Sequence, residues 1–215
     1  MPNNTATRRP VAAADRAQKP RPRTAETRKR ILDAAMTVFG TRGYNKGSLL
    51  EIAELAGMTH AGVLHHFGSK DNLLVAVLEY RDSDDVKDLD GQHVPPGSEL
   101  LAHLVETVRL NMTRAGIVQG YAVLAAESVT DGHPAADFFR DRFDGLRHMI
   151  MGAYAPIAPR DTPEARLEIA ASATIAVMDG MQVQWLLEPT VDMPAAVEAT
   201  IAGLIAWLRG ATQPL

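Results

Sequence analysis

The sequence predicts an all-α fold, with a small three-helix helix-turn-helix domain at the N-terminus and a larger helical domain after it. Apolar residues recur at helical spacing along most of the 215 residues, whereas alternating runs of β-branched residues are absent. Serine, threonine and proline stand at the expected helix starts, where they cap or fit the first turn. Helices therefore account for every ordered segment that we expect.

Composition limits the class of protein before any motif is considered. Hydrophobic residues make up 46% of the chain and charged residues 22%, as in a globular protein with a sizeable core. There is no cysteine, which excludes disulfides and thiolate metal sites. No apolar run approaches the roughly 20 residues of a membrane span, and no signal peptide is recognisable. We expect a cytoplasmic protein with no membrane partner.

The net charge of -4 hides an asymmetry between the two parts of the chain. Residues 1–70 hold 12 Lys and Arg against 5 Asp and Glu, whereas the remainder holds 10 against 21. A basic segment on an acidic body is typical of a module that binds a polyanion. The alternative is that the basic segment only aids solubility.

Residues 1–23 form a basic arm that cannot build a core. The segment has four prolines and almost no large apolar side chains, so we expect it to be disordered. Such an arm could add phosphate contacts or be inert. Its cationic residues are Arg8, Arg9, Arg16, Lys19, Arg21 and Arg23.

Three short helices follow the arm. The first begins at Thr24 and ends at Gly43, near the C-cap position where glycine is least strained. Ser48 opens an S-x-x-E capping box for the second helix, and Gly57 ends it. Thr59 then caps the third helix. Two short helices hinged at a glycine predict a helix-turn-helix.

The third helix should present one side to the core and the other to solvent. At about 100° per residue, Val63 faces the core, with Gly62 and His66 beside it. The opposite side is small and polar, which suits close entry into the major groove of DNA. Histidines there can hydrogen-bond base edges, alanine permits close approach, and leucine can touch a thymine methyl. This side carries His60, Ala61, Leu64 and His65.

Helix N-termini supply the expected phosphate contacts. Backbone amides and the helix dipole favour an anion at Ser48, Thr59 and Lys70, which would fix the register on DNA. A shared metal ion is geometrically poor, because His60 and His65 diverge by about 140° around the helix. We expect no metal and no cofactor.

Residues 27–74 carry a resemblance to a known family: TRKRILDAAMTVFGTRGYNKGSLLEIAELAGMTHAGVLHHFGSKDNLL. The ILDAA, F and GY of the first helix, S..EIA..AG of the second and HF.SK..LL resemble the N-terminal domain of the tetracycline-repressor (TetR) family of transcriptional regulators. Leu64 departs from the pattern, because the family usually has a phosphate-contacting tyrosine there. The resemblance implies DNA contacts by Ser48, Thr59, His60, Ala61, Gly62, His65, His66 and Lys70.

A fourth helix, capped by Ser69 and running to about Arg81, should join the DNA-binding domain (24–70) to the body (71–215). Residues 82–98 are polar with two prolines, which favours a loop or a frayed helix end. Further helices are expected at roughly 98–115, 117–130, 134–155, 163–187 and 194–209.

The last helix, 194–209, is apolar around most of its circumference and therefore requires burial on two sides, and helix 163–187 carries an apolar side with small residues beside it. We expect a C2 homodimer through a four-helix bundle, or else packing inside one subunit. The segment DGMQVQWLLEP, residues 179–189, resembles the dimer-helix segment of TetR proteins. The expected interface residues are Ala173, Val177, Met181, Val197, Ile201, Leu204, Ile205 and Leu208.

The middle helices should enclose a pocket for a small-molecule effector. Methionine and aromatic residues mixed with a few polar ones fit an adaptable, mostly apolar cavity, although for any individual residue ordinary core is the simpler explanation. Release of DNA by the effector is implied by the family resemblance. The candidate lining residues are His103, Met112, Tyr121, Met149 and Met178, together with Gln119, His148 and Met151.

The sequence predicts a one-component transcriptional regulator that binds a palindromic operator in double-stranded DNA. Repression is the simpler expectation, and activation is the alternative. An enzyme is disfavoured, since G-x-S-x-G, H-E-x-x-H and Gly-rich phosphate loops are all absent. The alternative is a helical interaction or scaffold protein without specific DNA binding, which would not need the basic N-terminal part.

Overall fold

The computed structural model describes residues 22–87 and 95–210, and within these ranges it contains nine helices and no strand. The all-α prediction is therefore confirmed for the described chain. The predicted arm, apart from its last two residues, lies outside the described residues. No helix in the described ranges is both long and apolar enough to cross a membrane.

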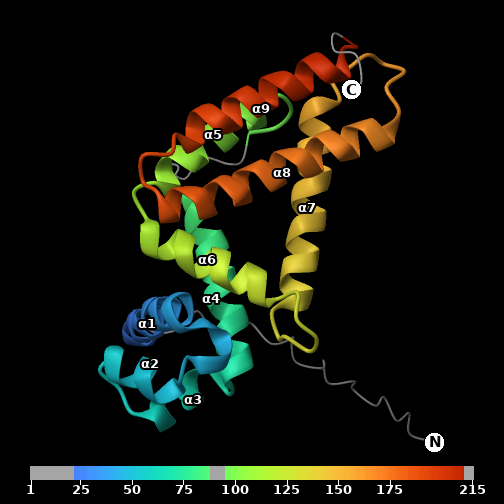
Figure 1. Ribbon diagram of the computed structural model, residues 1–215. Helices are drawn as coiled ribbons and strands as arrows, with labels where there is room; N and C mark the ends of the chain where they lie inside the picture. Colours follow the sequence, from blue (N-terminus) through green and yellow to red (C-terminus); the bar gives the residue numbers. More distant parts are fainter. Residues whose placement is uncertain (1–21, 88–94, 211–215) are drawn as a thin grey trace, which may run out of the picture.

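The first four helices are α1 (Pro22–Lys46), α2 (Leu49–Leu55), α3 (His60–Phe67) and α4 (Lys70–Lys87). The body contains α5 (Glu99–Asn111), α6 (Ala115–Glu127), α7 (Ala136–Tyr154), α8 (Glu164–Leu187) and α9 (Met193–Leu208). Figure 1 shows α1–α3 at one end of the molecule and α5, α8 and α9 at the other, with α6 and α7 between them.

Helix boundaries follow the predicted caps with differences of a few residues. α5 ends at Asn111 rather than near residue 115, and α6 ends at Glu127 rather than near residue 130. The Ser48 and Thr59 hydroxyls accept hydrogen bonds from the backbone N–H of Glu51 and Gly62, at 3.0 and 3.1 Å. α1 starts at Pro22 rather than Thr24, since proline fits the first turn of a helix. α4 continues to Lys87 rather than stopping near Arg81, so the expected loop begins later.

Gly43 interrupts α1 as predicted, although a short helical stretch resumes after it. Its φ of 73° and ψ of 170° are accessible to glycine and strained for other residues. The helical turn that follows closes with a hydrogen bond from the Gly47 N–H to the Gly43 carbonyl, at 3.1 Å. The chain thus changes direction at Gly43 before it enters α2.

A first hydrophobic core joins the helix-turn-helix to the body. Its buried side chains come from α1–α4, from α6 and from the start of α7, and they include Ile31, Val63, Leu74, Leu124 and Phe139. The first half of α4 belongs to this core, so its packing continues across residue 70. The predicted domain boundary at that residue stays a prediction.

α1 crosses α6 at two glycines, where the backbones approach closely. A Cβ built on Gly40 would lie 2.8 Å from the Gly120 Cα, and one built on Gly120 would lie 2.6 Å from the Met36 Sδ. Absence of a side chain at both positions therefore lets the two helices pack against each other. This is the most extensive helix pair in the described chain.

A second core fills the space among α5–α9. Its fully buried members include Ile150, Tyr154 and Met193. The polar atoms inside it are paired: the Tyr154 hydroxyl lies 2.9 Å from the Thr174 hydroxyl, which donates to the Ala170 carbonyl at 2.9 Å. Burial without loss of hydrogen bonds keeps these groups from destabilising the core.

Candidate nucleic-acid interface

α3 has the two-sided character that the sequence predicts. Val63 and Phe67 are buried in the first core, which fixes the inner side. Thr59, His60, Ala61 and His65 are exposed on the outer side. Gly62, Leu64 and His66 are half-buried between the two sides. Four of the nine predicted DNA-contacting residues thus lie together, exposed, in one short segment.

Arg28 of α1 secures the far end of α3, and the sequence did not indicate this role. Its guanidinium donates a hydrogen bond to the His66 carbonyl at 3.1 Å and lies 4.2 Å from the centroid of the Phe67 ring. The last carbonyls of a helix need such a donor, and a cation is favoured there by the helix dipole. Arg28 and His66 are 38 positions apart, so no spacing rule could have linked them.

Ser48 and Thr59, both exposed, have hydroxyls placed at helix starts. Each hydroxyl already accepts a backbone N–H from its own helix, at 3.0 and 3.1 Å. A hydroxyl that accepts one hydrogen bond keeps its O–H for another acceptor, such as a phosphate oxygen. Cap and phosphate contact are therefore compatible in both residues.

Lys70, the first residue of α4, is held against the segment that follows Gly43. Its ammonium lies 4.4 Å from the centroid of the Tyr44 ring and 3.4 Å from the Asn45 carbonyl oxygen. Burial lowers the pKa of Lys70, while the charges of Asp71 and Glu127 oppose that effect. The Lys70 side chain is thus held in one position rather than extending freely into solvent.

The three histidines of α3 do not form a metal site with other residues. The rings of His65 and His66 meet edge to face with centroids 5.8 Å apart. Across residues 22–87 and 95–210, no group of three His, Cys, Asp or Glu side chains is placed to hold an ion.

Comparisons with known proteins bear on this geometry. The family model "Bacterial regulatory proteins, tetR family" matches residues 31–77, which cover the helix-turn-helix and the first half of α4. The HTH-type transcriptional regulator AcrR of Shigella flexneri is 34% identical over 98 residues, or 42% of this chain and 46% of that protein. The match therefore spans less than half of that regulator.

One further relative and one solved structure extend the similarity into the body. The HTH-type transcriptional regulator PksA of Bacillus subtilis strain 168 is 26% identical over 168 residues, covering 75% of this chain and 80% of PksA. The solved fatty acid degradation regulator FadR from Bacillus halodurans shares the fold with a TM-score of 0.67 at 18% identity, over 84% of this chain and 99% of FadR. The helix-turn-helix part of this chain therefore matches the TetR family, and the chain shares the fold of a solved regulator.

α8 leaves an apolar stripe uncovered. Ile169, Val183 and Leu187 are 55%, 47% and 82% exposed, and the small residues Ala176 and Gly180 are exposed between them. Ile169 lies seven positions, or two helical turns, before Ala176, and the later members follow at intervals of three to four, so all five lie on one side of the helix. Large apolar groups in such a row are typical of a surface that another protein covers.

The predicted interface residues on α9 need correction. Val197, Ile201 and Leu208 are buried in the second core of their own chain, because α9 packs this stripe against α5 and α8. A second copy cannot reach them. The other five, Ala173, Val177, Met181, Leu204 and Ile205, are half-buried.

The predicted pocket residues are not brought together. Met149 is exposed, Met112 and Met178 pack at the edge of the second core, and Tyr121 is buried in the first. His103 is half-buried on α5, where burial lowers its pKa. The methionines were indistinguishable from core by sequence, and Met112 and Met178 are used as core.

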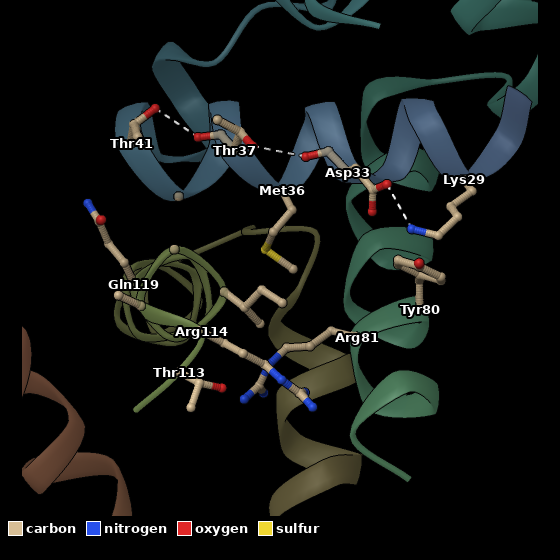
Figure 2. Close-up of a pocket in the computed structure, with 14 residues that line it drawn as sticks. Lys29, Asp33, Met36, Thr37, Thr41, Tyr80, Arg81, Thr113, Arg114 and Gln119 are labelled. Carbon is tan, nitrogen blue, oxygen red and sulfur yellow. Dashed lines mark hydrogen bonds and ion pairs between the residues drawn. The ribbon is translucent and has the colours of Figure 1, made fainter. Parts of the chain in front are cut away.

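A cleft of about 530 Å³ lies instead between α1, α4 and the start of α6 (Figure 2). Of the predicted pocket residues only Gln119 lines it. At one end the Lys29 ammonium pairs with Asp33 at 3.0 Å, and at the other Arg81 and Arg114 point toward each other. The volume falls in the range of small-molecule sites, and the lining mixes apolar and cationic groups.

Tyr121 lies directly behind this cleft. The Arg81 guanidinium stacks 3.9 Å from its ring centroid, and the Arg142 guanidinium donates a hydrogen bond to its hydroxyl. Burial raises the pKa of Tyr121, partly opposed by the two arginines. α4, α6 and α7 are thereby tied together at a point next to the cleft.

Proposed function

We propose that this protein is a one-component transcriptional regulator, a repressor that binds a palindromic operator in double-stranded DNA as a homodimer. One observation carries the proposal: α3 is capped, locked to the core by Val63 and Phe67, and exposes His60, Ala61 and His65. A short rigid helix with a small polar outer side fits the major groove, where base edges are read.

The proposed roles follow from the chemistry of each side chain. His60 and His65 hydrogen-bond base edges, and Ala61 lets the helix backbone approach them. Ser48, Thr59 and Lys70 contact phosphates and fix the register. Leu64, which is half-buried, touches DNA only through the exposed part of its side chain.

Dimerisation through α8 supports recognition of a palindrome. The exposed stripe of Ile169, Val183 and Leu187 gives a second copy an apolar surface to cover. In a C2 dimer the two copies of α3 would lie about 34–36 Å apart, one turn of DNA. Such a dimer on a promoter would block access of polymerase, which favours repression.

A small-molecule effector is proposed to release the DNA by binding the cleft between α1, α4 and α6. The cleft touches α1, which also carries Arg28 at the end of α3. A ligand that fits the cleft in only one arrangement of these helices would shift the protein toward that arrangement.

DNA binding is tested by electrophoretic mobility shift or fluorescence anisotropy at several salt concentrations. The affinity should fall steeply with salt, because neutralised phosphates release counterions. His60→Ala and His65→Ala should weaken specific binding about tenfold or more and leave non-specific binding nearly unchanged, whereas Lys70→Ala should weaken both and reduce the salt slope by about one. The matched control is His148→Ala, since His148 is an exposed histidine on α7.

Three outcomes would contradict the proposal. Equal losses for His60→Ala, His65→Ala and Lys70→Ala would remove the assigned division between base and phosphate contacts. Binding without any salt dependence, or no binding at all, would favour the alternative of a helical scaffold protein. Mapping of bound genomic sites supplies the operator for these measurements.

A further inference from the structure

The segment that links α1 to α2 is held in place by a residue of the body. Gly43 breaks α1, and residues 44–48 lead from there to the cap of α2. The peptide N–H groups just after such a break lack their usual helical acceptors. One of them, that of Tyr44, finds its acceptor on α6.

Glu127, the last residue of α6, supplies that acceptor. The Tyr44 backbone N–H donates to the Glu127 Oε2 at 2.6 Å, across 83 positions of sequence. The carboxylate occupies the space beside Gly43, where a Cβ would lie 2.0 Å from Oε1. Gly43 therefore serves two purposes: it permits the positive φ, and it leaves room for the Glu127 side chain.

Tyr44 in turn positions the side chain of Lys70. Its hydroxyl donates a hydrogen bond to Asp71, and its ring lies under the Lys70 ammonium at 4.4 Å. The Asn45 carbonyl, one residue on, accepts from the same ammonium at 3.4 Å. Burial and the bond to Asp71 raise the pKa of Tyr44 to about 12, so the ring stays neutral.

His133 closes the other side of this arrangement. Its side chain is 2% exposed, and its ring meets that of Tyr44 edge to face with centroids 5.1 Å apart. The Ala135 N–H donates to its Nδ1 at 3.2 Å, which assigns the proton of the neutral ring to Nε2. Nε2 faces the Glu127 Oε2 at 3.9 Å. The Glu127 carboxylate is therefore confined between Tyr44 and His133.

We propose that Glu127 is a positioning residue for DNA binding, which acts by holding Tyr44 and thereby Lys70. Glu127 itself does not touch DNA. It belongs to the body and fixes the backbone against which the phosphate-contacting lysine is packed. A lysine already held in place loses less side-chain freedom when it binds a phosphate. The inference rests on the proposed DNA binding.

The direction in which DNA affinity changes when Glu127 is removed distinguishes a positioning role from a purely electrostatic one. Glu127 is a negative charge close enough to influence Lys70. If charge were its only contribution, removing it would strengthen the attraction of the protein for the DNA polyanion. If it positions Lys70, removing it weakens binding. The two explanations predict opposite changes in affinity.

The test is a double-mutant cycle of Glu127→Ala and Lys70→Ala, measured as operator affinity by anisotropy. Glu127→Ala alone should weaken binding about fivefold per bound subunit, the factor that one hydrogen bond contributes to an equilibrium constant. In the Lys70→Ala background the same change should have an effect of less than about twofold, because contacts that act through one another are not additive.

Two further variants make the result decisive. Glu106→Ala removes a surface carboxylate of α5, far along the chain from this network, and controls for the change in net charge. Glu127→Gln keeps a carbonyl oxygen for the Tyr44 N–H and should recover most of the affinity. Thermal unfolding of each variant shows whether a loss of DNA binding reflects loss of fold. If Glu127→Ala does not fold, the DNA affinity of Glu127→Gln is compared with that of the unaltered protein instead.

Each outcome has one interpretation. Affinity of Glu127→Ala equal to or tighter than that of Glu106→Ala would overturn the positioning role. A fivefold loss that persists in the Lys70→Ala background would overturn it as well. If the unaltered protein binds no DNA, the proposed function fails and this role fails with it. Normal binding by the unaltered protein and by Glu127→Ala would overturn the positioning role alone.

Discussion

The contact between α1 and α6 predicts that Gly40→Ala destabilises the protein. The new Cβ would lie 2.8 Å from the Gly120 Cα, whereas carbon atoms in contact prefer about 3.5–4.0 Å. The obstacle is backbone, so no side chain can turn aside. The two helices must separate by roughly 1 Å, which disturbs the first core along their most extensive contact.

The loss of stability caused by Gly40→Ala is best measured against the same substitution at a glycine with free space around it. Alanine in a helix is favoured over glycine by about 1 kcal/mol, and this gain applies equally at Gly145 of α7, where a Cβ meets nothing within 4 Å. Overpacking typically costs about 1–3 kcal/mol. Gly40→Ala should therefore unfold about 2–12 °C below Gly145→Ala, at about 2–4 °C per kcal/mol.

Gly120→Ala provides an internal check on this reasoning. Its Cβ would meet the Met36 Sδ at 2.6 Å, but that atom is near the end of a flexible side chain and can move. Thermal unfolding followed by circular dichroism, at one protein concentration, should rank Gly145→Ala above Gly120→Ala and Gly120→Ala above Gly40→Ala. A Gly40→Ala protein as stable as Gly145→Ala would refute the close contact of α1 with α6.

Three other measurements test separate features. Burial lowers the pKa of His133 in the folded protein from its usual 6.5, so the unfolded chain binds the proton more readily, and the free energy of unfolding is retained above pH 6.5 and falls as the pH drops below it. His133→Gln should therefore flatten the pH dependence of the unfolding midpoint. An unchanged slope would contradict this. Arg28→Ala should speed amide hydrogen exchange at residues 64–67 by releasing the end of α3, whereas Arg30→Ala, an exposed neighbour, should not. Val183→Asp should convert a dimer to a monomer in size-exclusion chromatography with light scattering, whereas Val129→Asp, at a valine 83% exposed, should leave the dimer intact; a strict monomer before any substitution would remove the dimer proposal.

Local features of the fold were accessible from sequence because each depends on neighbouring residues. The caps at Ser48 and Thr59 form as predicted, since a side-chain oxygen reaches an N–H three residues on. The break at Gly43 and the inward side of α3 at Val63 follow from backbone freedom and helical period. The end of α4 was missed, because polar residues at a helix end resemble those of a loop.

Contacts between distant segments were not accessible in the same way. An apolar stripe shows that one side of a helix is buried, but not which surface buries it. The Val197, Ile201 and Leu208 stripe of α9 was therefore assigned to a second subunit, whereas it packs inside its own. Exposure of Ile169, Val183 and Leu187 on α8 became visible only once the inner sides were filled.

The all-α class, the helix-turn-helix with its caps, and the small polar side of α3 can be read from residues within a few turns of one another. Three contacts depend instead on the packing of whole helices: α6 meets α1 at Gly40 and Gly120, Arg28 holds the end of α3, and Glu127 reaches Tyr44. These pairs are separated by tens of residues, and their meeting depends on how whole helices pack, which no local pattern of hydrophobicity or spacing specifies.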